Sequence, residues 1–542
     1  MKILTAELMR RADQLTVEKT GISYSMLMET AGQGVFSEIE KYLTSADGGE
    51  WNFVIFGGKG NNGGDGAVVA RRIWLHRLGK VKFYLVGRCE EMKGEARANV
   101  EILRSIASLD SSIEWNEVVT DIPDLNASRE RLVVIDALFG TGLRRRVEGI
   151  AASIIKLINQ LREEGAAVIA VDLPSGLLAD SNEAVEPHVR ADLTVALTAP
   201  KIANIQFPAA GANGELRIVR IGTPDVLLDQ VVMEGWKSEG TGNIETTEIE
   251  QIRNWLKRSQ CGVTAHKGNA GRVMVLAGTI GRTGAAALAA GAALRSGAGL
   301  VMVGTPVSAL PLLVSQCDSE VMTLPLPETI DGGFSAESMT QLESILNGWD
   351  ALAIGPGIRS DSVEARSFVQ RVIEQRSQPV VIDADGLNAL APWPAELKGS
   401  STVPIVITPH PGEMARLLSL TTAEIEQNRI AVARQLAMQQ HLIVVLKGAG
   451  TIIADPTGRV VVNGTGNEGM ATAGAGDVLT GIVAGLLARR SGPAMEAVIA
   501  GVWLHGMAGD LAASTTGRRA MIASDIRDHL YRAIIYAGGT AV

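Results

Sequence analysis

Two long series of short apolar segments, each followed by a glycine-rich or polar loop and then a helical pattern, constrain the fold of this chain most. The first series has expected strands at residues 51–58, 81–86, 132–135, 167–171 and 193–197. The second has expected strands at residues 272–276, 300–303, 351–354, 380–382, 405–408 and 442–446. Strands that alternate with helices are typical of a parallel sheet covered by helices on both faces. The sequence therefore predicts two α/β domains.

The boundary between these domains is expected where the alternation stops. Between Gly222 and Thr247 the chain becomes polar and glycine-containing, and a helical pattern resumes at residues 248–258. Stretches of this kind between patterned segments are typical of linkers. We therefore predict a first domain at residues 1–222, which begins with helix, a linker at 223–247 and a second domain at 248–542.

The composition argues against nucleic acid and membranes as partners. The 50 basic and 59 acidic residues give a net charge of −9 without a basic block, and aromatic residues make up only 4% of the chain. The longest apolar stretches contain glycines and are too short or too interrupted to span a bilayer, and the first residues do not form a signal sequence. Cys89, Cys261 and Cys317 are far apart, which favours a reduced, cytoplasmic setting.

The loop GGKGNNGGDG at residues 57–66 carries the first candidate site. It follows an expected strand and places Asn61, Asn62 and Asp65 among glycines whose backbone N–H groups could cradle a diphosphate. Its spacing fits neither the dinucleotide fingerprint nor a P-loop. The alternative is a sharp turn that needs glycine dihedral angles.

Two further strand ends carry polar residues in the same half. One contains Asp136 and the arginines 144–146, and the next contains Asp172 and Ser175. Oxygen atoms of Asn62, Asp136 and Ser175 could hold a cation such as potassium, which would leave Asp172 for proton transfer. The arginines could bind phosphate or simply form a solvated charged run.

The segments GGKGNNGGDG, VIDALFGTGL, AVDLPSG and LTAPK occur in this order and resemble the epimerase domain of NAD(P)H-hydrate repair enzymes over about residues 5–222. The resemblance implies a Rossmann-like three-layer sandwich that interconverts the R and S hydrates of NADH and NADPH at C6 of the nicotinamide ring. It implies potassium on Asn62, Asp136 and Ser175, and Asp172 as the acid/base residue. Lys201 matches the lysine of the family's TAPK-like segment, and its role stays open. The implied substrate ligands are Asn61, Asn62, Gly63, Gly64, Asp65, Gly140, Thr141, Gly142, Leu143, Arg144, Arg145, Arg146 and Asp172.

The second half has a glycine-rich segment at residues 463–487, in which Asp477 opens an apolar run. About 30 residues upstream, KGAGT at residues 447–451 follows an expected strand. One loop could hold a diphosphate while the other provides a base, as in phosphoryl-transfer sites. The alternatives are that Asp477 is an ordinary helix N-cap and that Lys447 is a surface lysine.

Two other strand ends in this half leave their roles open. His410 lies between two prolines and could move a proton, position a substrate group or be structural. Asp383, Asp385 and Asn388 could face a metal or cap the following helix. The sequence contains no HExxH or CxxC motif, so a zinc mechanism has no support.

GRTGAAALAAGAALRSGAGLV, GPG, DADGLNAL, TPHPGE, KGAGT and NGTGNEGMATAGAGD resemble the nucleotide-dependent NAD(P)H-hydrate dehydratases, whose fold is ribokinase-like, over about residues 248–535. Arg282 is bulkier than expected in the first of these segments. Bacterial members of the family use ADP and eukaryotic members ATP, with Mg2+ on the nucleotide phosphates. The resemblance implies catalysis by Asp477 and a hydrate site at Ala285, Gly357, His410 and Asp477. The implied nucleotide ligands are Lys447, Gly448, Ala449, Gly450, Thr451 and Gly476.

Together the two resemblances imply a bifunctional repair enzyme that uses ADP, with NAD(P)H hydrates as substrates. Asp477 would assist transfer of a phosphoryl group to the C6 hydroxyl, and loss of phosphate would restore NAD(P)H. The alternative is a ribokinase-like kinase of a vitamin precursor or sugar, with a non-catalytic nucleotide-binding module in front. The small residues of LAAGAALRSGAGL could pack against a second copy, so we also expect a homo-oligomer.

Overall fold

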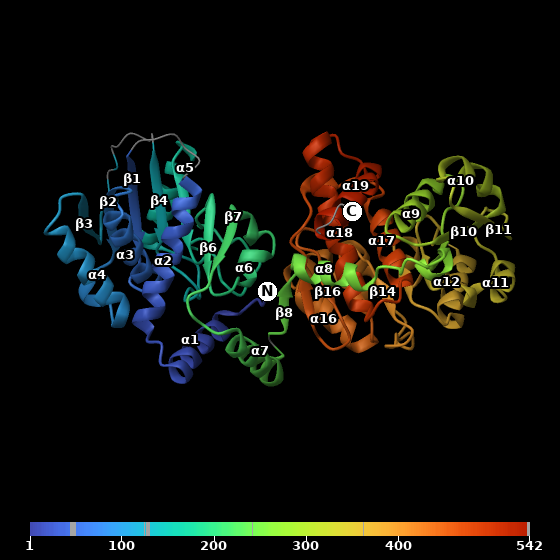
Figure 1. The fold of residues 1–542 in the computed structure, drawn as a ribbon, viewed down its shortest axis with the longest axis horizontal. Helices are drawn as coiled ribbons and strands as arrows, with labels where there is room; N and C mark the ends of the chain where they lie inside the picture. Colours follow the sequence, from blue (N-terminus) through green and yellow to red (C-terminus); the bar gives the residue numbers. More distant parts are fainter. Residues whose placement is uncertain (44–49, 124, 126–130, 241, 361, 539–542) are drawn as a thin grey trace. The chain divides into compact units, whose positions relative to one another are not determined.

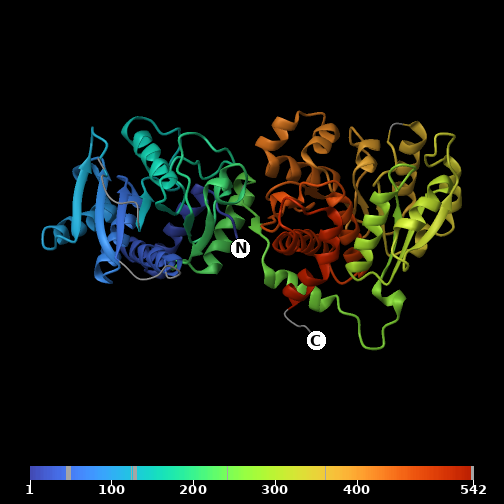
Figure 2. The ribbon, with the colours of Figure 1, turned by 90° about the horizontal axis from the view of Figure 1, so that it is seen from above.

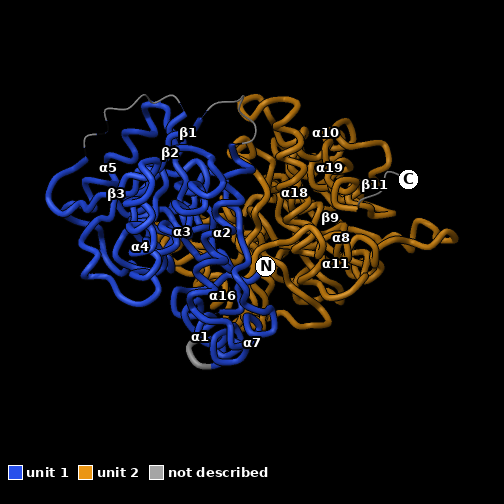
Figure 3. The backbone as a smooth tube through the Cα atoms, turned by 60° about the vertical axis from the view of Figure 1, so that its left-hand side comes forward, with its two compact units in different colours: residues 1–244 blue, residues 245–542 orange. Residues whose placement is uncertain are grey.

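The computed structural model describes residues 1–43, 50–123, 125, 131–240, 242–360 and 362–538. The chain divides into two compact units, Met1–Ile244 and Glu245–Val542 (Figure 3). Each unit is built around one sheet with helices on its faces, as predicted.

The first unit contains a sheet whose seven strands, among the described residues, follow the order β3-β2-β1-β4-β5-β6-β7 (Figure 1). All of its strand pairs are parallel. The inner strands are continuous apolar runs because both of their faces are buried. The strands are β1 Trp51–Gly57, β2 Gly79–Val86, β3 Ile113–Val118, β4 Leu132–Ala137, β5 Ala167–Val171, β6 Leu193–Leu197 and β7 Glu215–Val219.

Two apolar cores cover the faces of this sheet and make it the middle of three layers. Helices α2, α3 and α4 pack on one face, and α5 packs on the other. In Figure 2 the teal α5 and the dark blue helices lie on opposite sides of the strands. The helices of the unit are α1 Ala6–Thr20, α2 Tyr24–Leu43, α3 Asn61–Leu75, α4 Gly94–Ala107, α5 Gly149–Glu163, α6 Ile202–Ile205 and α7 Asp225–Glu239.

The prediction of a linker at residues 223–247 was wrong. This stretch contains α7 and the short strand β8 Ile244–Thr246, and the boundary between the units falls after Ile244. Apolar side chains of α7, including Leu227 and Val231, are buried against Leu4, Leu8 and other residues at the start of the chain. These apolar residues have helical spacing, but the acidic residues and glycines around them give the stretch a polar composition. The helix was therefore not predicted.

The second unit contains a sheet whose ten strands, among the described residues, follow the order β11-β10-β9-β12-β13-β14-β15-β16-β17-β8. Neighbours from β11 to β15 are parallel, and β15, β16 and β17 are joined antiparallel. The six expected strands of this half are confirmed. Its strands after β8 are β9 Arg272–Leu276, β10 Leu300–Pro306, β11 Met322–Leu326, β12 Ala351–Ile354, β13 Val380–Ile382, β14 Ile405–Ile407, β15 Ile443–Leu446, β16 Ile452–Ala454 and β17 Val460–Val462.

Small residues bring two helices of this unit unusually close together. A Cβ on Gly481 of α17 would lie 2.0 Å from the carbonyl oxygen of Ala289 in α9. Backbones approach this closely only where no side chain intervenes. The helices of the unit are α8 Ile249–Arg258, α9 Thr283–Arg295, α10 Leu310–Gln316, α11 Ala336–Glu343, α12 Val363–Gln375, α13 Asp385–Ala389, α14 Pro411–Leu418, α15 Thr422–Gln427, α16 Arg429–Gln440, α17 Ala475–Ala488, α18 Ala494–Thr516 and α19 Ala523–Gly538.

One helix of the described residues, α18, is long and apolar enough by length and composition to cross a membrane. This differs from the expectation that no apolar stretch reaches that length. The fold gives the reason, because 67% of the apolar window is buried inside the unit. The helix is apolar because it lies in the core around α17.

Candidate active sites

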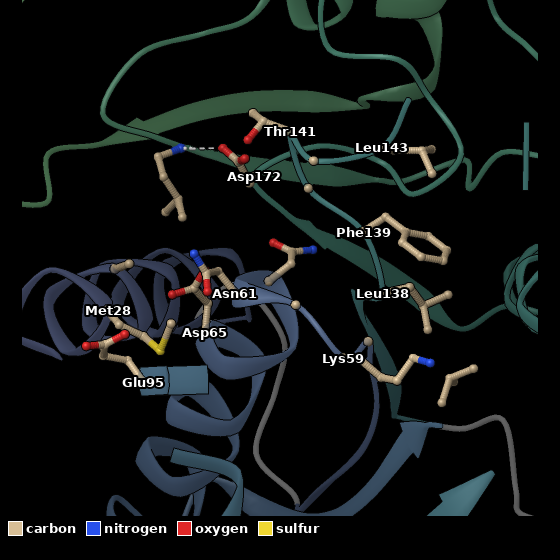
Figure 4. Close-up of a pocket in the computed structure, with 18 of the residues that line it drawn as sticks. Met28, Lys59, Asn61, Asp65, Glu95, Leu138, Phe139, Thr141, Leu143 and Asp172 are labelled. Atoms are coloured by element: carbon tan, nitrogen blue, oxygen red, sulfur yellow. Dashed lines mark hydrogen bonds between the residues drawn. The ribbon is translucent and has the colours of Figure 1, made fainter. Parts of the chain in front are cut away.

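The first unit has a cavity of about 730 Å³ at the carboxyl ends of its central strands. This is the edge at which parallel α/β sheets bind ligands, and the volume lies in the range of small-molecule sites. Figure 4 shows Asp172 and Thr141 on one side of the cavity, and Asn61 and Asp65 from α3 facing them. The structure thus brings together the predicted residues of three separate loops.

The glycines of the loop at residues 57–66 have different structural roles. Gly60 precedes α3 and lines the cavity together with Asn61 and Asn62 at the start of the helix. Gly63 lies so close to the preceding strand that a Cβ would sit 1.8 Å from the carbonyl oxygen of Gly58. Gly64 would likewise collide with Met28. Gly63 and Gly64 therefore allow the turn to close, and this close approach accounts for both glycines.

Asp172 is held at the end of β5 by a buried ion pair. Its Oδ1 accepts a hydrogen bond from the Lys201 ammonium and another from the Leu197 N–H at 3.1 Å. Lys201 is fully buried and also donates to the Leu197 carbonyl at 3.0 Å. Asp172 has a positive φ of 67°, a conformation that non-glycine residues adopt rarely and mostly at functional sites. The open role of Lys201 is therefore answered structurally, since its ammonium pairs with Asp172 and holds this side chain at the cavity.

Two other carboxyl groups share this cavity. Asp65 is buried, and desolvation, together with the charges of Asp172 and Asp13, raises its pKa well above the usual range. Asp13 of α1 was not predicted as a site residue, yet it lines the same cavity. Burial raises the pKa of Asp13 to about 7, with Lys201 opposing the shift and Asp172 adding to it.

Asp136 and Ser175 form a buried polar pair beside the cavity. Ser175 donates to Asp136 through its Oγ at 2.6 Å and through its N–H at 2.7 Å. Burial raises the pKa of Asp136 to about 6, although the hydrogen bonds from Ser175 and Leu138 oppose the shift. Among the described residues, no lysine, arginine or histidine pairs with Asp136.

The surroundings of Asn62 complete this picture. A Cβ on Gly140 would lie 3.3 Å from both Asn62 Oδ1 and Asp172 Oδ2, so these oxygens flank the glycine backbone. The Nδ2 atom of Asn62 is buried and has no hydrogen-bond partner within the described ranges. An uncompensated buried carboxylate beside amide and hydroxyl oxygens fits a monovalent cation.

The predicted arginine ligands lie apart from these groups. Gly140, Thr141, Gly142 and Leu143 line the cavity, whereas Arg144, Arg145 and Arg146 are exposed outside its lining. Their position agrees with the alternative of a solvated charged run. A role for them in substrate binding stays a prediction.

In the second unit, Asp477 lies in the first turn of α17. The N-cap of this helix is Gly474, with a φ of 89°, so Asp477 is not the ordinary N-cap that was the alternative. Burial raises the pKa of Asp477 to about 7; Asp383 adds to the shift and Lys447 opposes it. A carboxyl group with this pKa can accept a proton near neutral pH.

Lys447, which follows β15, points into the same cluster. Its ammonium donates to Asp383 Oδ1 at 2.6 Å and lies 3.6 Å from Glu413 Oε2. Burial lowers the pKa of Lys447, but Asp383 and Glu413 outweigh this and hold it above the usual value. Asp383 also accepts from Thr480 Oγ1 of α17 at 2.8 Å. The alternative of a surface lysine is therefore wrong.

The loop after Lys447 and the first turn of α17 lie next to each other. A Cβ on Gly476 would lie 3.4 Å from Lys447 Nζ and 3.5 Å from Asp383 Oδ2. Gly448 has a φ of 133° and packs against the guanidinium of Arg429, which also donates to the Lys447 carbonyl. The side chain of Lys447, at the start of the predicted glycine loop, thus lies beside the first turn of α17. Gly448, Ala449, Gly450 and Thr451 form the predicted nucleotide loop.

His410 caps α14 in the structure. Its Nδ1 accepts from the Gly412 N–H at 3.0 Å, and Glu413 accepts from the His410 N–H at 2.7 Å in return. This reciprocal pattern is a capping box. The structural role left open for His410 is present, and its half-exposed ring keeps substrate contact as a prediction.

The carboxylates of DADGLNAL do not cap the following helix, and a role for them toward a metal stays a prediction. Asp383 pairs with Lys447, and Asp385 accepts from Arg282 Nη1 at 2.7 Å. The N-cap of α13 is Ala384. Among the described residues, no group of three or more histidine, cysteine, aspartate or glutamate side chains is arranged to hold a metal ion.

Arg282 also lies beside two predicted hydrate ligands. A Cβ on Gly357 would lie 2.8 Å from Arg282 Cβ and from its carbonyl oxygen. The Ala285 N–H bonds to the same carbonyl at 3.3 Å. The backbone of residue 282 therefore requires a glycine at position 357, while the guanidinium of Arg282 extends to Asp385.

Comparison with known proteins decides the family. A family model described as YjeF-related protein N-terminus matches residues 24–203, and one described as NAD(P)H-hydrate dehydratase matches residues 273–532. A bifunctional NAD(P)H-hydrate repair enzyme from Moorella thermoacetica is 39% identical over 98% of this chain and 96% of its own length. The chain belongs to the bifunctional NAD(P)H-hydrate repair enzymes. A relative of the same description from Escherichia coli is 32% identical over 98% of this chain and 93% of its own.

A solved structure related to this repair-enzyme family matches part of the chain. It is an ADP/ATP-dependent NAD(P)H-hydrate dehydratase from Bacillus subtilis, co-crystallised with ATP/Mg2+. It is 30% identical and covers 55% of this chain and 100% of its own, with a TM-score of 0.48.

One further residue beside the second candidate site, His505, was not predicted from the sequence. His505 of α18 contacts the Ala475 carbonyl through Nε2 at 2.9 Å, directly before Gly476 and Asp477. Burial lowers the pKa of His505 to about 4, so the ring is neutral at physiological pH and donates from Nε2. His505 thereby fixes the first turn of α17. No sequence motif marks it, because its partner belongs to another helix.

Proposed function

We propose that this chain repairs hydrated NADH and NADPH in two steps, with each step performed by one unit. The first unit interconverts the R and S hydrates, and the second converts the S hydrate to NAD(P)H at the expense of ADP. The observation that carries this assignment is the pair of separate acid/base carboxyl groups, Asp172 against Lys201 and Asp477 beside the Lys447 loop. An enzyme that accepted only one epimer would leave the other unrepaired, so the two activities serve one task.

Dehydration needs a better leaving group than hydroxide. Asp477 takes the proton of the C6 hydroxyl while that oxygen attacks the β-phosphoryl group of ADP, which releases AMP. Loss of phosphate from C6 and of a proton from C5 then re-forms the double bond. The backbone N–H groups at the start of α17 stabilise the charge that develops on the phosphoryl group.

The nucleotide is held by the loop Lys447, Gly448, Ala449, Gly450 and Thr451 together with Gly476, and the hydrate lies near Ala285, Gly357, His410 and Asp477. The ammonium of Lys447 lies near Gly476 and supplies positive charge next to this loop. Mg2+ bound to the nucleotide phosphates would neutralise part of their charge. ADP is the proposed nucleotide rather than ATP.

In the first unit, potassium would be held by Asn62, Asp136 and Ser175. The buried carboxylate of Asp136, which is paired only with hydrogen-bond donors of Ser175 and Leu138 among the described residues, and the Oδ1 atom of Asn62 beside the Gly140 backbone support this assignment. Such an ion would compensate the buried carboxylate and hold the β4–α5 loop against the start of α3. Substrate lies against Asn61, Asn62 and Asp65 of α3 and the loop 140–146, with Asp172 as the acid/base residue.

The alternative of a small-molecule kinase is not favoured. A kinase of that type has no use for the first unit, whose cavity contains an intact acid/base pair. A cytoplasmic setting and a homo-oligomer complete the proposal, with neither nucleic acid nor a membrane as partner.

The test uses the purified full-length protein with S hydrate and ADP. We expect the near-ultraviolet absorbance of NADH to return together with stoichiometric AMP and phosphate. R hydrate alone should yield the S form in the absence of nucleotide. A stable phosphorylated product without NADH would instead establish the kinase.

A further inference from the structure

Helix α1 contributes a titratable side chain to the cavity of the first unit, although the family model matches only from residue 24 onward. Three side chains of α1, Met9, Arg10 and Asp13, line this cavity. Thr5 caps the helix, and Leu8, Met9, Ala12 and Leu15 anchor it in an apolar cluster with α7. Asp13 is therefore presented from a fixed backbone and is not part of a surface run.

The carboxyl group of Asp13 is in an unusual position for an aspartate. Its Oδ1 is buried and has no hydrogen-bond partner in the part of the chain that the structure describes. Buried carboxylates are strongly disfavoured unless they are paired. Asp13 thus lines the cavity, and its Oδ1 has no protein partner among the described residues. A bound substrate could supply the missing partner.

The charges that face Asp13 come from four elements. Asp65 lies on α3, Asp172 follows β5, Lys201 precedes α6, and Arg10 is on α1 itself. The ammonium of Lys201 is committed to Asp172 and to the Leu197 carbonyl. This cation is therefore already paired with Asp172. Burial raises the pKa of Asp13 to about 7, so its carboxyl group can hold a proton up to near-neutral pH.

Epimerisation at C6 moves a hydroxyl from one face of the ring to the other. The lone pair of N1 can form a double bond to C6 as the C6–O bond breaks, and the departing hydroxyl must receive a proton to leave as water. A water molecule then adds to the other face of C6 and must lose a proton. One acid and one base are therefore required, and one proton is gained and one lost in each cycle.

We propose that Asp13 is a second catalytic residue of the epimerase cavity, which gives its proton to the departing hydroxyl while Asp172 takes the proton of the incoming water. In the reverse direction the two groups exchange roles. After each turnover, proton exchange with solvent restores the starting state. This inference rests on the proposed epimerase activity.

The test is carried out on the full-length protein with R hydrate and no nucleotide, so that dehydration does not remove the S form. Asp13→Asn keeps the shape of the side chain but has no acidic proton. We expect kcat for epimerisation to fall about 10²- to 10⁴-fold, the range for loss of a general acid or base. The affinity for hydrate, measured by calorimetry, should change less than about threefold. Glu7→Gln, an exposed change on the same helix, is the matched control and should behave as wild type.

The pH dependence of epimerisation distinguishes a catalytic role of Asp13 from a purely structural one. In the wild type, kcat/KM for epimerisation should decline as pH rises through about 7, because Asp13 loses its proton there. Asp13→Asn should lack this decline. Asp13→Glu restores an acid in a longer side chain and should recover part of the rate together with the decline. This second variant keeps the test decisive if Asp13→Asn is poorly folded.

Three results would overturn the inference. Asp13→Asn could retain epimerisation within about threefold, its pH profile could match the wild type, or Asp13→Glu could fail to regain either rate or pH dependence. Failure of the wild type itself to interconvert the hydrates would refute the proposed function instead, so the two failures are distinguishable.

Discussion

Both units have a lysine within a cluster of carboxyl groups near the carboxyl ends of their parallel strands, but the two lysines have different partners. In the first unit Lys201 contacts Asp172, the proposed acid/base residue, itself. In the second unit Lys447 contacts a neighbour, Asp383, and Asp477 is left among other carboxylates. Burial and the neighbouring Asp383 raise the pKa of Asp477 to about 7, and Lys447 only opposes this shift, whereas Asp172 has Lys201 as its direct partner.

The difference suits the two reactions. In the proposed dehydration a single base is needed, and Asp477 with a pKa of about 7 is suited to that role. The proposed epimerisation needs an acid and a base together, and these roles are assigned to Asp13 and Asp172. The proposal therefore assigns one base to the second unit and an acid and a base to the first.

The largest expected effect comes from removing each acid/base residue in turn. Asp477→Asn should reduce dehydration about 10²- to 10⁴-fold and leave R/S interconversion within about twofold of wild type. Asp172→Asn should do the reverse. NADH absorbance and chromatographic separation of the epimers measure the two rates, and Asp528→Asn, an exposed change on α19, serves as the control. Loss of both activities in either single variant would refute the separation of the two sites.

A smaller effect distinguishes Gly481 of α17, which packs against α9, from Gly476 of the same helix, which is proposed to contact the nucleotide. Gly481→Ala should destabilise the second unit by about 1–3 kcal/mol or more, because its Cβ would lie 2.0 Å from the Ala289 carbonyl oxygen. Gly476→Ala has room, since its nearest atoms lie at 3.4 Å and 3.5 Å. It should leave the melting temperature unchanged and raise KM for ADP. Equal melting temperatures for the two variants would contradict this account of the α9–α17 contact.

The smallest expected effect tests the influence of Asp383 on Asp477. Asp383→Asn removes a neighbouring negative charge and frees Lys447, and both changes lower the pKa of Asp477. Because a base is active when ionised, the rising limb of kcat/KM for dehydration should move to lower pH by about one unit or less. An unchanged or raised limb would show that Asp383 does not set the titration of Asp477.

Much of the fold could be predicted from the sequence because buried parallel strands are continuous apolar runs. The expected strands at 272–276, 351–354 and 380–382 coincide with β9, β12 and β13. The edge strand β3 was missed because only its first and last residues are buried and it contains two glutamates. The short antiparallel β16 and β17 lack the flanking helices that marked the others.

The same holds for the site residues. Those marked by a local sequence motif could be predicted, and those that depend on residues far apart in the sequence could not. Asp172 and Asp477 were predicted because each lies in a glycine- or proline-marked turn at a strand end or helix start. Asp13 was not predicted, because it lies within an amphipathic helix that carries no such mark. The pairing of Lys447 with Asp383 spans 64 residues of sequence and depends on the strand order of the sheet. Which carboxylate pairs with Lys447 can therefore be determined only from the three-dimensional structure.

The central claim is that the second unit uses Asp477 as a base and the first unit uses Asp13 as an acid, and one pH series tests it most directly. Both activities are measured as kcat/KM on the same full-length preparation between about pH 6 and 8. Dehydration should rise through about pH 7 as Asp477 loses its proton, and epimerisation should fall over the same interval as Asp13 loses its own. Profiles that rise or fall together would contradict the account.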